Sequence, residues 1–211
     1  MNLNFADFSA QWSKLHGGTA TTGIVGGWLK ISFPLARACA KLRITPNVLT
    51  TIGVLSAGVT AIVSPHWWSL VFLAISLIAD GIDGSVAIYT ERTSASGAIW
   101  DGLADRISEA LWAVAFYRLG IPLGLIFALA SLAAFQEYAR ARLASLGIAE
   151  VGVVTSSERP VRASFLAIAI VACALNFSSN WLTGIAGVLT GLQLVGFAMV
   201  VRFAFKSLKK F

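Results

Sequence analysis

The stretch DGIDGSVAIYTERTSASGAIWDGLAD, residues 80–105, decides how this chain folds and where its chemistry lies. It contains four aspartates, Asp80, Asp83, Asp101 and Asp105. Two long apolar segments carry them, and Arg106 is the one basic residue in either segment. An ionised carboxylate inside hydrocarbon costs at least about 2.5–3.5 kcal/mol on insertion scales, so acids in such segments mark functional sites.

The composition places the chain among membrane proteins. It has 211 residues, of which 57% are hydrophobic and 12% are charged, and its mean hydropathy is +0.78. Soluble domains have about 25% charged residues, and a helix needs about 20 mainly apolar residues to cross a bilayer. Six stretches approach that length: residues 48–63, 67–89, 97–117, 122–143, 161–175 and 181–203. The sequence therefore predicts an all-α integral membrane protein with six transmembrane helices.

The distribution of the net charge of +6 predicts the topology. Basic residues precede the first stretch, follow the second and the fourth, and close the chain, whereas residues 64–66 and 176–180 contain no Lys or Arg. Basic residues in short loops mark the cytoplasmic side of a membrane. We therefore expect a multi-pass protein of the plasma membrane with both termini and the acidic site in the cytoplasm. The basic balance needs no nucleic acid to explain it.

The N-terminal residues divide into two expected parts. Residues 1–23 are polar and are interpreted as a loosely ordered leader. In residues 24–44, apolar residues alternate with Lys30, Arg37 and Lys41, which share one helical face. Such a segment favours a cytoplasmic interfacial amphipathic helix. Residues 45–205 then form the six-helix catalytic domain, and residues 206–211 form a basic cytoplasmic tail.

The four aspartates are arranged to share one site. The acids within each segment are three or four residues apart, which places them on one face of a helix. The connection at residues 91–96 is short, so the two helices run antiparallel and their acids can converge. Oxygen-only ligands suit Mg²⁺, Mn²⁺ or Ca²⁺ rather than Zn²⁺. Gly84 and Gly97 leave room for a substrate or a helix to approach the backbone.

The pattern Asp80-x-x-Asp83-Gly84-x-x-Ala87, followed by Gly97-x-x-x-Asp101-x-x-x-Asp105, resembles the signature of the CDP-alcohol phosphatidyltransferase family. The resemblance covers about residues 24–205. It implies an enzyme of phospholipid biosynthesis that transfers a phosphatidyl group from CDP-diacylglycerol to an alcohol and releases CMP. It also implies six membrane helices preceded by an interfacial helix, a lipid bilayer around them, and a homodimer.

The resemblance assigns roles to individual residues. Asp80, Asp83 and Asp101 would bind two Mg²⁺ or Mn²⁺ ions together with Asp105, and Asp105 would also accept the proton of the attacking hydroxyl. The expected donor-binding residues are Asn47, Thr50, Gly84, Ala87, Gly97 and Arg92. The chain departs from the family pattern at Ile88, where the family usually has an arginine that would hold the diphosphate. Arg92 would take over this role if the helix continued that far.

Five arginines are candidates for the acceptor site: Arg140, Arg142, Arg159, Arg162 and Arg202. Guanidinium clusters bind phosphate bidentately, although ordinary cytoplasmic charge explains the same residues. These segments are similar to those of the actinobacterial phosphatidylinositol phosphate synthases. The favoured acceptor is therefore inositol phosphate. The alternative is glycerol 3-phosphate, the acceptor of a phosphatidylglycerol phosphate synthase.

Two functions of other classes stay open at this point. A transporter or cation channel also has acids inside its membrane helices, but the four aspartates all lie at the expected cytoplasmic end. An inactive scaffold of the same family is the other alternative, because Ile88 replaces the arginine. The sequence does not distinguish the acceptors further.

Overall fold

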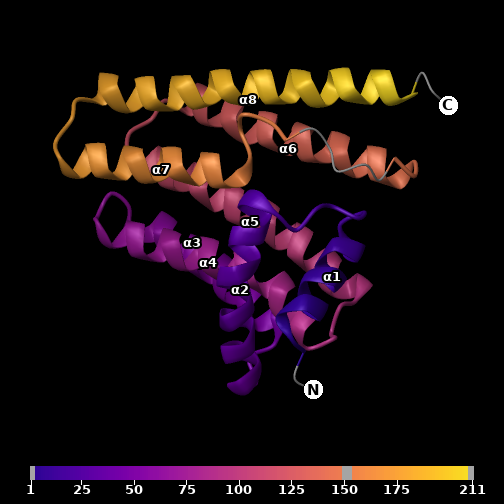
Figure 1. The fold of residues 1–211 in the computed structure, drawn as a ribbon. Helices are drawn as coiled ribbons and strands as arrows, with labels where there is room; N and C mark the ends of the chain where they lie inside the picture. Colours follow the sequence, from indigo (N-terminus) through magenta and orange to yellow (C-terminus); the bar gives the residue numbers. More distant parts are fainter. Residues whose placement is uncertain (1–2, 149–153, 209–211) are drawn as a thin grey trace. The chain divides into compact units, whose positions relative to one another are not determined.

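A computed structural model of the chain describes residues 3–148 and 154–208. These residues form eight α-helices and no strand (Figure 1). The helices are α1 (Phe5–Leu15), α2 (Gly23–Lys41), α3 (Pro46–Val63), α4 (Trp68–Tyr89), α5 (Ala95–Arg118), α6 (Leu123–Ser145), α7 (Arg159–Ala174) and α8 (Ser179–Leu208). The predicted all-α class is confirmed, and each of the six predicted apolar stretches is a helix whose ends differ by a few residues.

The chain divides into two compact units. Unit 1 comprises Met1–Ser56 and Ala74–Ile107, and unit 2 comprises Ala57–Leu73 and Ser108–Phe211. Helices α3, α4 and α5 each contribute residues to both units. Unit 1 contains the four aspartates, and unit 2 contains the five arginines proposed for the acceptor.

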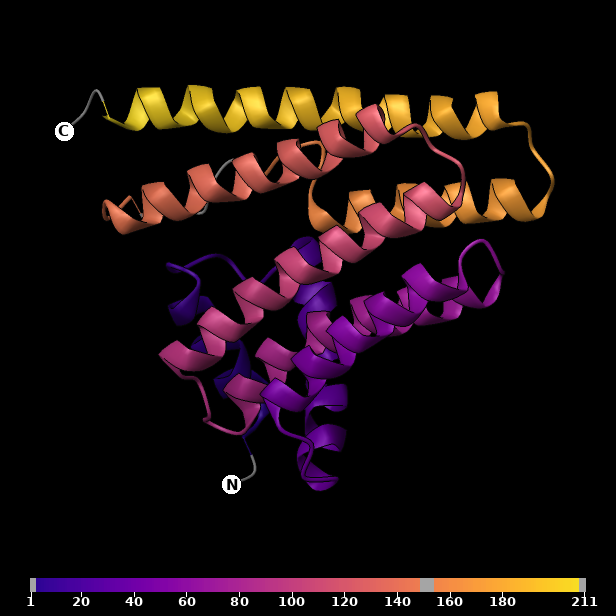
Figure 2. The ribbon, with the colours of Figure 1, turned by 180° about the vertical axis from the view of Figure 1, so that it is seen from behind.

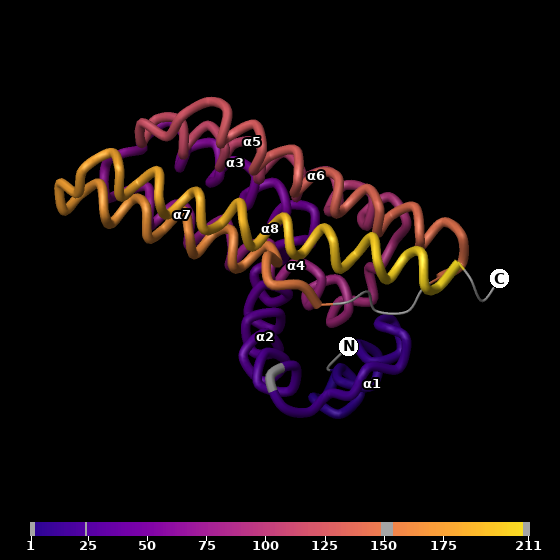
Figure 3. Tube along the Cα trace, turned by 90° about the horizontal axis from the view of Figure 1, so that it is seen from above, coloured from indigo at the N-terminus to yellow at the C-terminus, as the bar shows by residue number. Residues whose placement is uncertain are grey.

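The N-terminal residues form an ordered part of unit 1. Helix α1 begins at the N-cap Asn4, whose side chain accepts a hydrogen bond from the backbone N–H of Asp7 at 2.9 Å, and such a cap satisfies a donor that the helix leaves open. The ring of Phe8 is fully buried, in a cluster that includes Leu29 of α2 and Val86 of α4. Helix α1 packs against α2 (Figure 3). Within residues 1–23, where a polar leader is expected, apolar packing holds α1 in place.

Three helices, α3, α4 and α8, are long and apolar enough to cross a membrane. Helices α5 and α6 have charged residues among their apolar ones, and α7 has only 16 residues. Large apolar side chains also remain exposed on these helices, among them Ile62, Phe127 and Trp181. Extensive exposed apolar surface is typical of contact with lipid, so the helices have the character of a membrane protein.

Helices α6, α7 and α8 lie side by side in unit 2 (Figures 1 and 2). Leu166 and Ile170 of α7 and Leu189 of α8 are almost completely buried between them. Two small residues, Ala169 and Ala186, are fully buried in the same packing, and small side chains let helices approach closely. This packing fixes α6 and α7, which carry four of the five arginines.

Candidate active site

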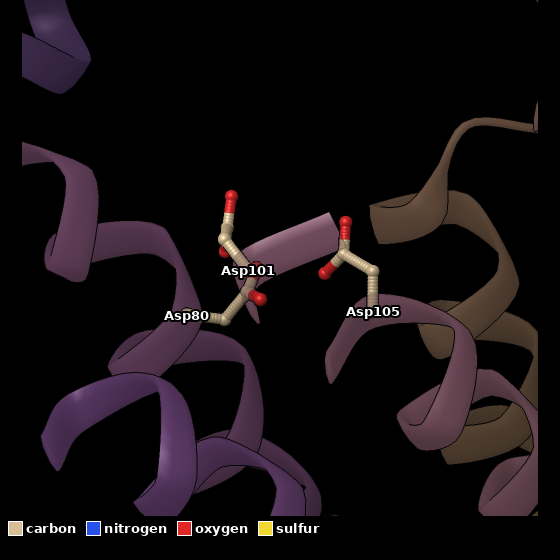
Figure 4. Close-up of side chains that lie close together, drawn as sticks. All are labelled: Asp80, Asp101 and Asp105. Carbon is tan, nitrogen blue, oxygen red and sulfur yellow. The ribbon is translucent and has the colours of Figure 1, made fainter. Parts of the chain in front are cut away.

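Three of the four aspartates converge in unit 1. Asp80 of α4 and Asp101 and Asp105 of α5 each have a carboxylate oxygen within 4.8 Å of the others (Figure 4). Opposite oxygens around a Mg²⁺ ion are about 4.2 Å apart, since each bond is about 2.1 Å long. The three half-buried carboxylates are thus close to the spacing that a divalent cation requires. Their chemistry suits Mg²⁺ or Mn²⁺, because all the ligand atoms are oxygens.

The fourth aspartate, Asp83, is not part of this cluster. Its Oδ2 accepts a hydrogen bond from the Thr50 hydroxyl of α3 at 2.5 Å, and its Oδ1 accepts one from the Gly84 N–H at 2.6 Å. Asp83 is 5% exposed and Thr50 is 4% exposed, and both line the cavity that opens beside the acids. Asp83 thus differs from the other three acids because α3 holds its carboxylate.

A cavity of about 190 Å³ opens beside the acids. Its lining includes the six residues predicted to bind the donor: Asn47, Thr50, Gly84, Ala87, Arg92 and Gly97. Asp83 and Asp101 line it as well. A Cβ atom at Gly84 would meet nothing within 4 Å, whereas one at Gly97 would lie 3.0 Å from the Ser94 hydroxyl. Gly84 therefore keeps open space at the cavity, and Gly97 allows a close approach of the turn before α5.

Comparison with known protein families and with curated relatives identifies the family. The profile described as CDP-alcohol phosphatidyltransferase matches residues 43–198. The chain belongs to this family. It is 31% identical to the archaetidylinositol phosphate synthase of Aeropyrum pernix over 141 residues, which cover 63% of this chain and 71% of that protein. It is 27% identical to the phosphatidylinositol phosphate synthase of Mycolicibacterium smegmatis over 188 residues, covering 80% and 83% of the two chains.

Solved structures agree on the fold of this CDP-alcohol phosphatidyltransferase. Two are crystal structures of the phosphatidylinositol phosphate synthase of Mycobacterium tuberculosis, one with CDP-DAG bound and the other in complex with manganese and citrate. The first is 20% identical with a TM-score of 0.66, and covers 83% of this chain and 94% of its own. The second is 18% identical with a TM-score of 0.64, and covers 82% and 88%.

Two positions near the donor cavity of the phosphatidyltransferase differ from expectation. Helix α4 ends at Tyr89, so it does not continue to Arg92, yet Arg92 lines the cavity from the turn that follows. Ile88 also lines the cavity, but its side chain is 4% exposed and belongs to the apolar cluster around Phe8. An apolar residue at position 88 fits this environment, because α1 supplies apolar side chains to the same cluster. The arginine that the family usually has at this position would not benefit from such partners.

Sequence reasoning missed the contribution of α1 to the cavity. Leu15 and His16, at the C-terminal end of this helix, line it. The His16 ring stacks on Trp12 at 3.9 Å between centroids, and its Nδ1 lies 2.8 Å from the Trp12 carbonyl oxygen. The spacing of Trp12 and His16, one helical turn apart, is the signal that could have indicated them.

Two arginines of unit 2, Arg140 and Arg162, are paired with glutamates that the sequence reasoning left out. Arg140 makes a two-nitrogen contact with Glu158 at 2.6 and 3.0 Å and also reaches Glu137 at 3.2 Å. Arg162 is only 5% exposed; its Nη1 lies 2.5 Å from Glu109 and its Nη2 lies 3.7 Å from Glu137. A buried charge requires such a partner. These two arginines are therefore part of an ion-pair network.

The other arginines of the set are placed differently. Arg159 lies with its guanidinium carbon 5.3 Å from the centre of the Trp112 ring, which is a cation–π arrangement. The side chains of Arg142 and Arg202 are exposed. Burial raises the pKa of the Glu158 carboxyl, but hydrogen bonds from Arg140 and Thr155 outweigh this effect and bring its pKa down to about 2. The Glu158 carboxyl is thus ionised at neutral pH.

Proposed function

We propose that this phosphatidyltransferase moves the phosphatidyl group of CDP-diacylglycerol to inositol phosphate and releases CMP. The observation that carries the proposal is the convergence of Asp80, Asp101 and Asp105 in a chain of this family. The relatives support the acceptor, because the Aeropyrum and Mycolicibacterium proteins are both named for an inositol phosphate product.

The aspartates are proposed to hold two Mg²⁺ or Mn²⁺ ions. Asp80, Asp101 and Asp105 offer oxygens at close spacing, and Asp83 lies beside them as the ligand that Thr50 orients. When bound, the metal would neutralise negative charge on the diphosphate and on the departing CMP. The crystal structure of the Mycobacterium tuberculosis synthase with manganese supports this choice of cation.

Asp105 is proposed to accept the proton of the attacking hydroxyl. The acceptor oxygen forms a bond to the phosphorus of the phosphatidyl group as its proton passes to the Asp105 carboxylate. The bond between that phosphorus and the bridging oxygen breaks, and CMP leaves with the electron pair. Arg106, the neighbouring residue on α5, lies 3.7 Å from the Asp105 carboxylate.

The donor is proposed to lie in the cavity at Asn47, Thr50, Gly84, Ala87, Gly97 and Arg92. The cavity supports this assignment because it combines open space at Gly84 with the cation Arg92. A guanidinium at this position suits a diphosphate, so Arg92 takes the role of the arginine that is absent at position 88.

The acceptor phosphate is proposed to bind at the arginines of unit 2. Because Arg140 and Arg162 are held by glutamates, we assign them to shaping the site. Arg142, Arg159 and Arg202 are then assigned to the phosphate itself. The Arg159 guanidinium carbon lies 5.3 Å from the centre of the Trp112 ring, and a guanidinium suits bidentate contact with phosphate oxygens.

We further propose that all six helices α3–α8 cross the plasma membrane. In this arrangement α2 lies on the cytoplasmic surface, and both termini and the active site face the cytoplasm. The distribution of Lys and Arg supports this topology, and the family resemblance supports a homodimer. Labelling of single cysteines introduced into residues 64–66 and 93–96 with an impermeant reagent tests it. Labelling of 93–96 in intact cells would contradict the topology.

The function is tested by following CMP release from CDP-diacylglycerol with purified protein and Mn²⁺. Inositol phosphate, inositol, glycerol 3-phosphate and serine are compared at equal concentrations. We expect inositol phosphate to react fastest, because an unphosphorylated acceptor leaves arginines without their anion. Preference for glycerol 3-phosphate would contradict the proposed acceptor but would agree with the proposed phosphate-binding site. Preference for inositol or serine would refute that site.

A further inference from the structure

Unit 1 contains a second, larger cavity, which shares Arg92 with the donor cavity. It measures about 480 Å³ and contains none of the aspartates. Its charged lining residues are Arg37, Lys41, Arg43, Glu91 and Arg92. Four basic side chains and one acidic side chain give this lining a formal charge of +3. Arg92 also lines the donor cavity, so the two cavities are neighbours within the unit.

Two helices, α2 and α4, end at this basic cavity with the same hydrogen-bond pattern. After α2, the N–H groups of Ile44 and Arg43 donate to the carbonyls of Cys39 and Ala40 at 2.9 and 3.1 Å. After α4, the N–H groups of Arg92 and Glu91 donate to the carbonyls of Ala87 and Ile88 at 2.8 and 3.1 Å. This is the Schellman arrangement, in which the residue after the C-cap adopts a left-handed conformation.

The residues in the left-handed position are unusual at these two ends. Elsewhere the helix ends use Gly17, Gly120 and Gly147, with φ between 65° and 85°, or Asn176 with φ of 60°. Glycine and asparagine are the residues that accept this conformation most readily. At the basic cavity the positions are held by Arg43, with φ of 58°, and Glu91, with φ of 55°. Both charged residues that replace glycine thus lie at the same cavity.

Basic residues at helix C-termini commonly offset the negative end of the helix dipole. This role accounts for only part of the positive charge that lines the cavity. Each C-terminus carries about half a negative charge from the helix dipole, so two helix ends offset about one of the four cations. Glu91 offsets one more. Roughly two positive charges remain, or one when Arg92 contacts the donor, and this excess matches a phosphate group with one or two negative charges.

We propose that the basic cavity binds a phosphate group with one or two negative charges. Guanidinium and ammonium groups from α2, from the turn after it and from the end of α4 surround such a group on several sides. The phosphate belongs either to the headgroup of an anionic lipid or to a soluble phosphate. Basic pockets at the cytoplasmic ends of membrane helices bind lipid headgroups in this way.

The test uses the full-length protein in nanodiscs and measures its unfolding temperature, which rises when a ligand binds the native state. One arm adds inorganic phosphate to protein in phosphatidylcholine nanodiscs. The other arm replaces part of the phosphatidylcholine with phosphatidylglycerol. The variants are Arg43→Gly, Glu91→Gly and, as a matched control at a helix end outside the cavity, Asn176→Gly. Arg92 is left intact because it lines both cavities.

The wild type is expected to be stabilised in at least one arm, and that arm identifies the source of the phosphate. Arg43→Gly should weaken binding about tenfold or more, since it removes a charge-assisted contact, while its unfolding temperature without ligand stays equal or rises because glycine suits the backbone. Glu91→Gly should bind more tightly, and Asn176→Gly should bind as the wild type does. Absence of stabilisation in both arms would overturn the proposal, as would equal binding by Arg43→Gly and the wild type.

Discussion

Substitution of Thr50 by valine tests the most specific contact of the active site. Valine has nearly the same shape but lacks the hydroxyl that donates to Asp83 at 2.5 Å. Both residues are almost fully buried, and the donor cavity is where another group could reach the Asp83 carboxylate. A hydrogen bond to a charged group is worth about 1.5–3 kcal/mol. If this whole energy is expressed only in the transition state, through correct placement of Asp83, kcat/KM should fall about 10- to 150-fold.

The assay is Mn²⁺-dependent release of CMP from CDP-diacylglycerol, measured over a range of metal and donor concentrations. Thr50→Ser keeps the hydroxyl and should restore most of the activity. Thr51→Val is the matched control, because the exposed Thr51 hydroxyl donates only to the Asn47 carbonyl at 2.8 Å. A higher metal requirement would show that Thr50 acts through Asp83, whereas a higher donor KM alone would show direct contact with the donor. Wild-type turnover at every Mn²⁺ concentration would refute both roles.

Four further outcomes are expected. Asp101→Asn should abolish CMP release and leave the unfolding temperature nearly unchanged, since a neutral amide is a poor metal ligand; measurable turnover at saturating Mn²⁺ would contradict the metal site. Arg159→Ala should raise the acceptor KM and leave the donor KM unchanged in steady-state kinetics. Arg162→Ala should instead destabilise the fold by about 3–5 kcal/mol in a denaturation experiment, because it strands a buried Glu109 carboxylate. The pKa of Glu158 is lowered from 4.5 to about 2 in the folded protein, so its ionisation should stabilise the fold fully above pH 4.5, and this stabilisation should be lost as the pH falls towards 2. Across this range the unfolding temperature should change with pH at a different slope in the wild type and in Glu158→Gln.

The sequence predicted the helices well because apolar runs of near-spanning length leave few alternatives. The first was expected at residues 48–63, and α3 is Pro46–Val63. Helix α1 escaped prediction because the polar composition of residues 1–23 conceals its pattern. Its apolar residues Phe5, Phe8, Trp12 and Leu15 are spaced three, four and three apart, which is a helical period. Periodicity was therefore the better guide to this segment than composition.

The convergence of three aspartates was also predictable, since spacing and a short connection dictated it. The hydrogen bond that holds Asp83 was not predictable. Its carboxylate is held by Thr50, which is 33 residues away in sequence, and no local pattern reports such a contact. Spacing alone fixes which helix face an acid occupies, whereas its hydrogen-bond partners depend on which helix packs against that face.

The roles of the arginines of unit 2 were also not predictable from the arginines alone, and the acids that pair with them must be counted as well. The sequence reasoning counted five arginines as phosphate ligands: Arg140, Arg142, Arg159, Arg162 and Arg202. It did not count the three glutamates that pair with two of them, Glu109, Glu137 and Glu158. A buried guanidinium requires an anion, so an arginine that a glutamate already holds is a weaker candidate for a phosphate ligand. Glutamates hold Arg140 and Arg162, and Arg142, Arg159 and Arg202 remain the candidates for contact with a phosphate monoester, whose charge is about −1.5 to −2 at pH 7. A phosphorylated acceptor offers these arginines an anion, whereas inositol does not, which is why the acceptor comparison is the decisive measurement for this phosphatidyltransferase.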